Sequence, residues 1–241
     1  MRRTGLEPVA PSTSMKCSTT ELTTQVLLFK LKFNLMSIQT ENESKNELLK
    51  AGKKVGYKGL VYDPNKPKNV ADHYKHLTTE EIIQSLESKR GNYSILLLNI
   101  EYDNNVGSII RTANAFGAKE IILYGRKKFD RRASVGVEFY MNFRQLSHFN
   151  EIDPILSEFD HIIALENNIN FKTTPISKFV WEKDKKTLIC IGQEGSGLPN
   201  EILEKCTDFV EINQKGSVRS LNVSAAAAIV MYDYCLKTDS L

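Results

Sequence analysis

The sequence has 241 residues, of which 41% are hydrophobic and 25% charged, with a formal net charge of +3. These values are those of an ordinary globular protein, and the length allows one large domain or two small ones. No apolar run reaches the ~18 residues that a membrane helix needs, which argues against a membrane span. The small positive charge permits nucleic-acid binding without arguing for it.

Residues 1–45 show no periodicity that predicts folded structure. The segment 4–24 is rich in Ser, Thr and Pro, and two lysines interrupt the apolar run 26–36. No small-residue cleavage site follows this run promptly, so a signal peptide is not favoured. We therefore expect residues 1–45 to be a disordered or spurious tail, with Met36 as an alternative start.

Residues 46–92 form a basic extension in which lysines alternate with tyrosines. Such a pattern can follow a phosphate backbone and stack on bases, although a solvated surface explains it as well. Thr78 and Glu81 have the spacing of a capping box and predict a short helix that ends near Ser88.

From Ser94 onward, strands alternate with helices. The apolar run 95–100 predicts a strand, the spacing of apolar residues in 105–116 predicts a helix, and 120–124 predicts the next strand. Such a unit implies parallel pairing with a right-handed crossover.

The basic segment 125–132 follows the second of these strands. Because ligands gather at the carboxyl ends of parallel strands, we expect this segment to meet an anion. A solvated loop is the alternative. The predicted RNA-binding residues are Arg126, Lys127, Lys128, Arg131 and Arg132.

Further strands are predicted at 161–165, 188–191 and 209–212, each followed by a polar turn. The turn 192–197 holds three glycines around a single acid, Glu194, and the turn 214–219 leads to an alanine-rich helix. Strand ends and polar turns that feed helices are what a small-molecule pocket on a parallel sheet requires.

Cysteine and histidine give no sign of a metal site. The four cysteines form no C-x-x-C pair, and no cysteine or carboxylate pattern complements His73 and His76. We expect buried, reduced thiols, no metal, and a reducing compartment, the cytoplasm.

Three polar motifs occupy residues 105–117, 192–199 and 220–227. The first has the pattern N-x(5)-R followed by small residues and glycine, the second is the glycine-rich turn with its acid, and the third is SLNVSAAA. In order and spacing, these motifs resemble those of the SpoU (TrmH-like) branch of the SPOUT RNA methyltransferases.

The resemblance implies an α/β parallel-sheet domain, here 93–241, with a C-terminal trefoil knot, and a homodimer that binds S-adenosylmethionine and methylates a ribose 2′-hydroxyl of tRNA or rRNA. The cofactor positions that it implies are Gly192, Glu194, Gly197, Ile212 and Leu221. The implied catalytic positions are Asn105, Arg111, Glu194, Ser220 and Asn222.

Methyl transfer to a hydroxyl requires oxygen, methyl carbon and sulfur to be held in line, which contributes roughly 7–11 kcal/mol. The guanidinium of Arg111 is hard to deprotonate, so we expect it to contact the hydroxyl and a neighbouring phosphate. Two other functions fit part of the pattern. One is an inactive RNA-binding protein that keeps the fold. The other is a nucleotide-binding enzyme such as a dehydrogenase, against which the glycine spacing G-x-x-G-x-G argues.

Overall fold

The structure is a computed structural model that describes residues 54–55, 61–62, 69–125, 128–167 and 169–240. The chain divides into two units, residues 1–55 and 56–241. Only strand β1 (Lys54–Val55) is described in the first unit. The predicted tail and most of the predicted basic extension lie outside the described residues, and the boundaries at 45 and 92 remain predictions.

The second unit is built on a parallel sheet whose described strands have the order β5-β4-β3-β8-β6-β9-β7. Each neighbouring pair is parallel, and Ile95 at the centre pairs with Ile121 on one side and Ile189 on the other. The strands are β2 (Val61–Tyr62), which lies outside this sheet, β3 (Tyr93–Leu98), β4 (Ile121–Tyr124), β5 (Phe143–Leu146), β6 (His161–Leu165), β7 (Thr174–Pro175), β8 (Thr187–Ile191) and β9 (Asp208–Glu211).

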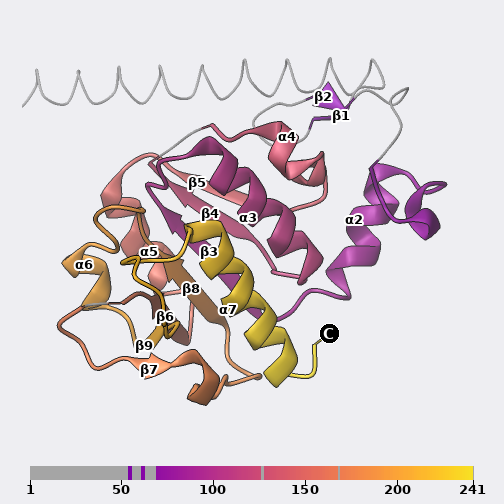
Figure 1. The fold of residues 1–241 in the computed structure, drawn as a ribbon. Coiled ribbons are helices and arrows are strands. Elements are labelled where there is room, and N and C mark those ends of the chain that lie inside the picture. Colours follow the sequence, from indigo (N-terminus) through magenta and orange to yellow (C-terminus); the bar gives the residue numbers. More distant parts are fainter. Residues whose placement is uncertain (1–53, 56–60, 63–68, 126–127, 168, 241) are drawn as a thin grey trace, which may run out of the picture. The chain divides into compact units, whose positions relative to one another are not determined.

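Helices cover both faces of this sheet (Figure 1). The α-helices are α2 (Thr79–Glu87), α3 (Asp103–Ala115), α4 (Arg131–Ser134), α5 (Ile152–Leu156), α6 (Asn200–Leu203) and α7 (Val223–Lys237). Single 3₁₀ turns are η2 (Asp72–Tyr74), η3 (Val137–Phe139), η4 (Phe149–Glu151) and η5 (Ile176–Lys178).

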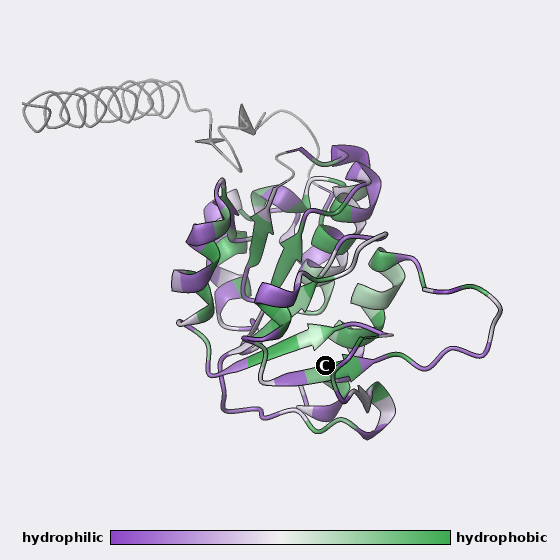
Figure 2. Cartoon of the chain, turned by 90° about the vertical axis from the view of Figure 1, so that its left-hand side faces the viewer, coloured by the Kyte–Doolittle hydropathy of each residue, from purple (hydrophilic) through white to green (hydrophobic). Residues whose placement is uncertain are grey.

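Two hydrophobic cores lie on opposite faces of the sheet, since alternate residues of a strand point to opposite sides. Ile95 and Ile189 pack with α3 and α7, whereas Leu96 and Cys190 pack with α5 and α6. Strands buried on both faces are apolar throughout, as Figure 2 shows for the green strands of the sheet. The predicted α/β parallel-sheet class is confirmed.

Most of the predicted elements are present with small shifts. The capping box at Thr78 and Glu81 is present. Strand β3 begins and ends two residues earlier than predicted, because Asn99 adopts a positive φ of 56° and ends the extended run. Helix α3 begins two residues earlier, with Tyr102 as its N-cap, so Asn105 lies inside the helix.

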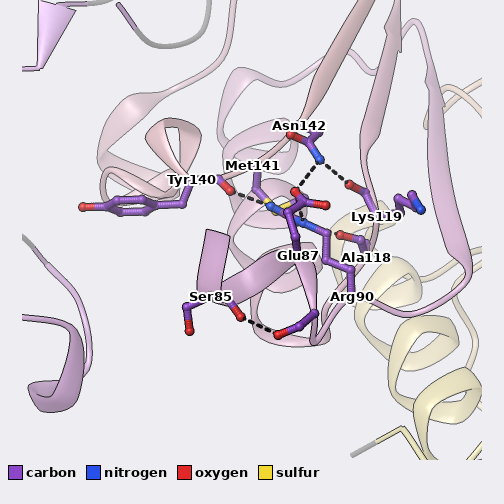
Figure 3. A network of polar contacts seen from close by, with 9 residues as sticks. Ser85, Glu87, Arg90, Ala118, Lys119, Tyr140, Met141 and Asn142 are labelled. Carbon is purple, nitrogen blue, oxygen red and sulfur yellow. Dashed lines mark hydrogen bonds and ion pairs between the residues drawn. The ribbon is translucent and has the colours of Figure 1, made fainter. Parts of the chain in front are cut away.

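Arg90 anchors the end of α2 to the body of the unit, and Figure 3 shows the contacts. Its side chain is only 4% exposed and donates to the carbonyl oxygens of Ala118 (3.0 Å) and Tyr140 (2.7 Å) and to the carboxylate of Glu87 (2.9 Å). Asn142 donates to the same carboxylate at 3.0 Å. A buried guanidinium with this many acceptors is stable only in this geometry.

Replacing Arg90 by alanine should lower the free energy of unfolding by about 2–4 kcal/mol, because two carbonyl oxygens lose their donor and a carboxylate loses its counter-charge. Urea unfolding followed by circular dichroism measures this change. Lys75→Ala is the control, since its exposed ion pair with Asp72 should contribute less than about 1 kcal/mol. Equal stability of Arg90→Ala and wild type would contradict the anchoring role.

Candidate functional site

A pocket lies at the carboxyl ends of the neighbouring strands β8, β6 and β9, where such sheets place ligands. Its empty volume, which includes the solvent at its open mouth, is about 570 Å³. Its walls combine aliphatic side chains with a few polar groups. They are Leu165, Glu166, Asn167, Ile191, Gly192, Gln193, Glu194, Ile212, Gln214, Ser220, Leu221, Val223 and Ala226.

The glycine-rich turn after β8 forms one wall of the pocket and is closed by a bond from the Gly197 N–H to the Gln193 carbonyl at 2.9 Å. A Cβ on Gly192 would lie 2.3 Å from the carbonyl carbon of Gly197, so only glycine fits there. Gly197 adopts a φ of +70°, the left-handed region that favours glycine. Of the two, Gly192 itself lines the pocket.

A chain of hydrogen bonds joins the three sequence motifs beside this pocket. The Glu194 carboxylate accepts from the Glu101 N–H and from the Asn105 side chain, both at 2.8 Å. The Asn105 oxygen accepts in turn from the Asn222 side chain at 3.1 Å. The Asn222 oxygen accepts from the Ser224 and Ala225 N–H groups and caps α7. The structure thus brings three predicted catalytic residues into one network.

Glu166 is a site residue that sequence reasoning missed. It directly follows β6, and its carboxylate accepts from the N–H groups of Leu198 (3.0 Å) and Asn167 (2.9 Å). A Cβ on Gly197 would lie 2.4 Å from one of its oxygens, so the acid packs directly against the glycine-rich turn. Its place at the carboxyl end of a buried strand is the signal that could have identified it.

Ser220 and Arg111 are the predicted catalytic residues outside this network. Ser220 lines the pocket, and its hydroxyl makes no hydrogen bond to a described residue. Arg111 is exposed on α3, does not line the pocket, and forms no ion pair or hydrogen bond within the described part of the chain. Neither Ser220 nor Asn105 caps a helix, because Tyr102 and Asn222 occupy those positions.

The predicted cofactor positions Gly192, Glu194, Ile212 and Leu221 all line the pocket, and Gly197 completes the turn behind Gly192. Leu221 is 37% exposed at the rim. These positions come from two loops, the one after β8 and the one between β9 and α7. The pocket lining therefore combines the glycine-rich turn, aliphatic side chains and the two acidic residues Glu166 and Glu194.

The basic segment after β4 lies beside α3. Arg126 and Lys127 lie outside the described residues, whereas Lys128, Arg131 and Arg132 are exposed. Arg131 donates at 2.9 Å to Glu138, a carboxylate that is only 2% exposed.

Arg132 forms a two-pronged contact with Asp130, and its hydrogen bonds hold the pKa of that carboxyl below the usual value. The positive charges of Arg131 and Arg132 are thus partly neutralised by Glu138 and Asp130.

Two buried thiols lie in β8 and α7. Cys190 and Cys235 are buried free thiols, as predicted, and Cys206 is half-buried, while Cys17 lies outside the described residues. The neighbouring Cys206 thiol, together with burial, raises the pKa of Cys190 well above its usual value, which disfavours a nucleophilic thiolate.

Within the residues that the structure describes, no cluster of three or more histidine, cysteine or acidic side chains could hold a metal ion. No helix in these same ranges is long and apolar enough to cross a membrane.

Known proteins are similar to this chain in sequence and in fold. The model of the SpoU rRNA Methylase family matches residues 92–232. A Staphylococcus haemolyticus protein assigned to the TrmH family of tRNA/rRNA methyltransferases is 27% identical over 169 residues. This match covers 66% of the present chain and 65% of the relative, so the chain spans less than two thirds of that protein.

Two solved structures are similar in fold and sequence. The SpoU methyltransferase AviRb from Streptomyces viridochromogenes, solved in complex with AdoMet, is 25% identical with a TM-score of 0.54, covering 63% of this chain and 60% of its own. A structure described as an RNA 2′-O ribose methyltransferase is also 25% identical, with a TM-score of 0.53, covering 61% of this chain and 57% of its own.

Proposed function

The chain belongs to the SpoU rRNA methylase family, and we propose that it transfers a methyl group from S-adenosylmethionine to a ribose 2′-hydroxyl of tRNA or rRNA. The observation that carries this proposal is the chain of hydrogen bonds from Glu194 through Asn105 to Asn222, which joins all three motifs beside one pocket. The named reactions of the relatives support the chemistry: one structure is that of an RNA 2′-O ribose methyltransferase.

The chemistry of the pocket lining suits the proposed cofactor. Aliphatic side chains such as Ile212 and Leu221 would pack on a purine ring, and the polar backbone of the turn after Gly192 would hold the amino-acid part. The carboxylates of Glu166 and Glu194 give the site negative charge that suits a cation. The Cβ-free surface of Gly192 lets a ligand approach the backbone closely.

The residues around the pocket would have different roles in the proposed reaction. S-adenosylmethionine, when bound, supplies an electrophilic methyl group on a positively charged sulfur. Ser220, with its uncommitted hydroxyl at the pocket wall, would hold the ribose hydroxyl in position. The hydrogen bond between Glu194 and Asn105 would keep the pocket wall rigid, so that little entropy is lost when the reacting groups are oriented. Arg111 would contact the hydroxyl and a neighbouring phosphate, and that phosphate would assist transfer of the hydroxyl proton to solvent, because a guanidinium remains protonated and cannot accept it.

The basic residues after β4 are proposed to bind the RNA backbone. Lys128, Arg131 and Arg132 are exposed near the start of α3. Phosphate oxygens would replace Asp130 as the partner of Arg132 when RNA binds, since a surface ion pair is weak and easily exchanged.

The experiment that tests this function is methyl transfer from radiolabelled S-adenosylmethionine to separated tRNA and rRNA fractions that lack the modification, followed by nucleoside analysis. A labelled 2′-O-methyl nucleoside is expected, and its fraction identifies the substrate class. A label on a base would contradict the ribose assignment. Cofactor binding without any label would favour an inactive RNA-binding protein that keeps the fold.

We also propose that the protein is a homodimer that packs through α7. The exposed side of this helix carries an apolar stripe, with Ile229, Tyr232 and Leu236 exposed by 39%, 48% and 52%. The opposite side, with Val230 and Met231, is buried in the core. A helix that is apolar on all sides is normally covered on all sides. A second copy would cover the stripe with the same stripe, as two-fold interfaces do.

The double substitution Ile229→Glu and Tyr232→Glu places two negative charges in this stripe and should convert the dimer to a monomer. Burying an unpaired carboxylate in the interface would cost at least about 3 kcal/mol. Sedimentation equilibrium measures the mass, and circular dichroism checks that α7 still forms. Lys183→Glu, in an exposed loop, is the matched charge change and should leave the dimer intact. A monomeric wild type, or a dimer that survives both charges, would refute this interface.

The trefoil knot remains part of the proposal. The segment that follows β9 contributes Gln214, Ser220 and Leu221 to the pocket and then reaches α3 through the bond between Asn222 and Asn105. This course past the ends of β6 and β8 supports the proposed knot.

A further inference from the structure

Tyr102 is a large aromatic side chain that stands exposed at the edge of the site. Its exposed fraction of 61% exceeds that of every other Phe, Tyr or Trp side chain in residues 69–240. The backbone of Tyr102 caps α3, and its carbonyl accepts from the Asn105 N–H at 2.9 Å. Its ring and hydroxyl make no hydrogen bond, ring-stacking or cation–π contact with other described residues, so no such contact explains an aromatic residue here.

The backbone holds Tyr102 between the pocket wall and the basic segment. On one side, the Glu101 N–H donates to Glu194 at 2.8 Å, and the Glu101 carboxylate accepts from Gln193 at 2.6 Å. On the other side, the Asp103 carbonyl accepts at 3.0 Å from the N–H of Asp130, the N-cap of α4. Helix α4 carries Arg131 and Arg132 and packs beside α3 (Figure 1). The backbone that carries the ring is therefore held by hydrogen bonds on both sides.

We propose that Tyr102 stacks on a base of the unpaired RNA segment that carries the methylated ribose. This inference rests on the proposed function. Aromatic side chains next to a basic groove are the usual platforms for unpaired bases, which offer a free π-face. The carboxylates of Glu101 and Asp103 disfavour a phosphate at this point, whereas an uncharged base face is tolerated. Phosphates would lie toward Arg131 and Arg132, and the ribose between Tyr102 and the pocket.

A base explains the surroundings of Tyr102 better than a protein partner does. The exposed residues next to it, Glu101 and Asn104, are polar, so the ring is solitary. The stripe on α7 is different, since its exposed apolar side chains follow one another along the helix. Protein interfaces bury contiguous patches with apolar centres, whereas a single ring is enough to stack on one base.

Three variants and a control test this inference. Tyr102→Ala should lower kcat/KM for the RNA about 5- to 150-fold, which corresponds to the ~1–3 kcal/mol of one base stack. Tyr102→Phe should retain activity close to wild type, and Asn104→Ala, which changes another exposed residue two positions along, should retain it fully. The affinity for S-adenosylmethionine, measured by calorimetry, should not change in any of them, because neither residue lines the pocket.

The third variant, Tyr102→Trp, detects stacking in an assay that does not depend on methyl transfer. Tyr102→Trp should show saturable fluorescence quenching on titration with the labelled RNA fraction, or with unfractionated tRNA and rRNA if neither fraction takes label. The wild type, whose single tryptophan, Trp181, is 5% exposed, should not.

Unquenched Tyr102→Trp together with full activity of Tyr102→Ala would overturn the inference, and so would a changed dimer mass in Tyr102→Ala with normal turnover. Quenching without any methyl transfer by the wild type would refute the proposed function and still support the stack.

Discussion

An Arg111→Ala variant is expected to lose about 100- to 1,000-fold in kcat/KM for methyl transfer, the range measured when one donor that faces developing charge is removed. Its affinity for S-adenosylmethionine should stay at the wild-type value. The reason is geometric: Arg111 stands on the exposed side of α3, outside the pocket, and bonds to no other described residue. The substitution therefore removes a contact to RNA and leaves the cofactor site intact.

Two further variants make this prediction specific. Arg111→Lys keeps the charge and loses the planar pair of donors, so it should fall between wild type and alanine. Lys119→Ala removes another exposed cation, at the amino end of β4, opposite the pocket, and should have no effect. Single-turnover methyl transfer and calorimetry separate the two quantities. Full activity of Arg111→Ala would remove Arg111 from the catalytic assignment, and weaker cofactor binding would place it at the pocket instead.

The central part of the fold could be predicted from the sequence because its elements are strongly patterned. Strand β6 was predicted with the observed bounds, since its five buried residues form an uninterrupted run. Helix α3 was predicted from apolar residues at helical spacing, all of which are buried. Short edge strands carry no such signal. Strand β5 was not predicted, because its polar residues Arg144 and Gln145 interrupt any apolar pattern. Such residues fit at the edge of the sheet, where Arg144 bonds to Glu120 and Glu158.

Within the site, residue types were easier to predict than contacts. Gly192, Glu194 and Asn222 follow strands, and the carboxyl ends of parallel strands meet at one edge, so their proximity follows from the topology. Which atoms bond depends on the final packing. The sequence did not show that Asn105 would bridge Glu194 and Asn222, or that Arg111, six residues further along α3, would lie outside the pocket. Glu166 was missed because one acid in a polar turn has no pattern of its own.

A Glu194→Gln variant is expected to be unstable as well as inactive, because the hydrogen-bonded chain has backbone donors at both ends. The Glu101 N–H donates at one end, and the Ser224 N–H donates at the other. Asn105 and Asn222 each contribute one donor and one acceptor in between. Such a chain closes only if one member accepts twice and donates nothing, and a carboxylate is the group that does so. An amide in its place leaves two donors facing each other, whichever way the amides turn.

The mismatch should cost about 1–3 kcal/mol of unfolding free energy and loosen the wall of the pocket. Urea unfolding and calorimetry with S-adenosylmethionine should both show the loss. Glu211→Gln is the matched control. The Glu211 carboxylate also accepts twice, but its partners are a rotatable Thr173 hydroxyl and the exposed Asn213, so a small change is expected.

Adding Asn105→Asp to Glu194→Gln moves the double acceptor one place along the chain and restores the match at every bond. The pair should therefore recover most of the stability that Glu194→Gln loses, with a favourable coupling of about 0.5–3 kcal/mol in a double-mutant cycle. Methyl transfer need not return, since the negative charge then lies farther from the pocket. Additive losses in the double variant would show that Glu194 acts through its charge alone, and that the order of donors and acceptors along the chain does not hold the three motifs together.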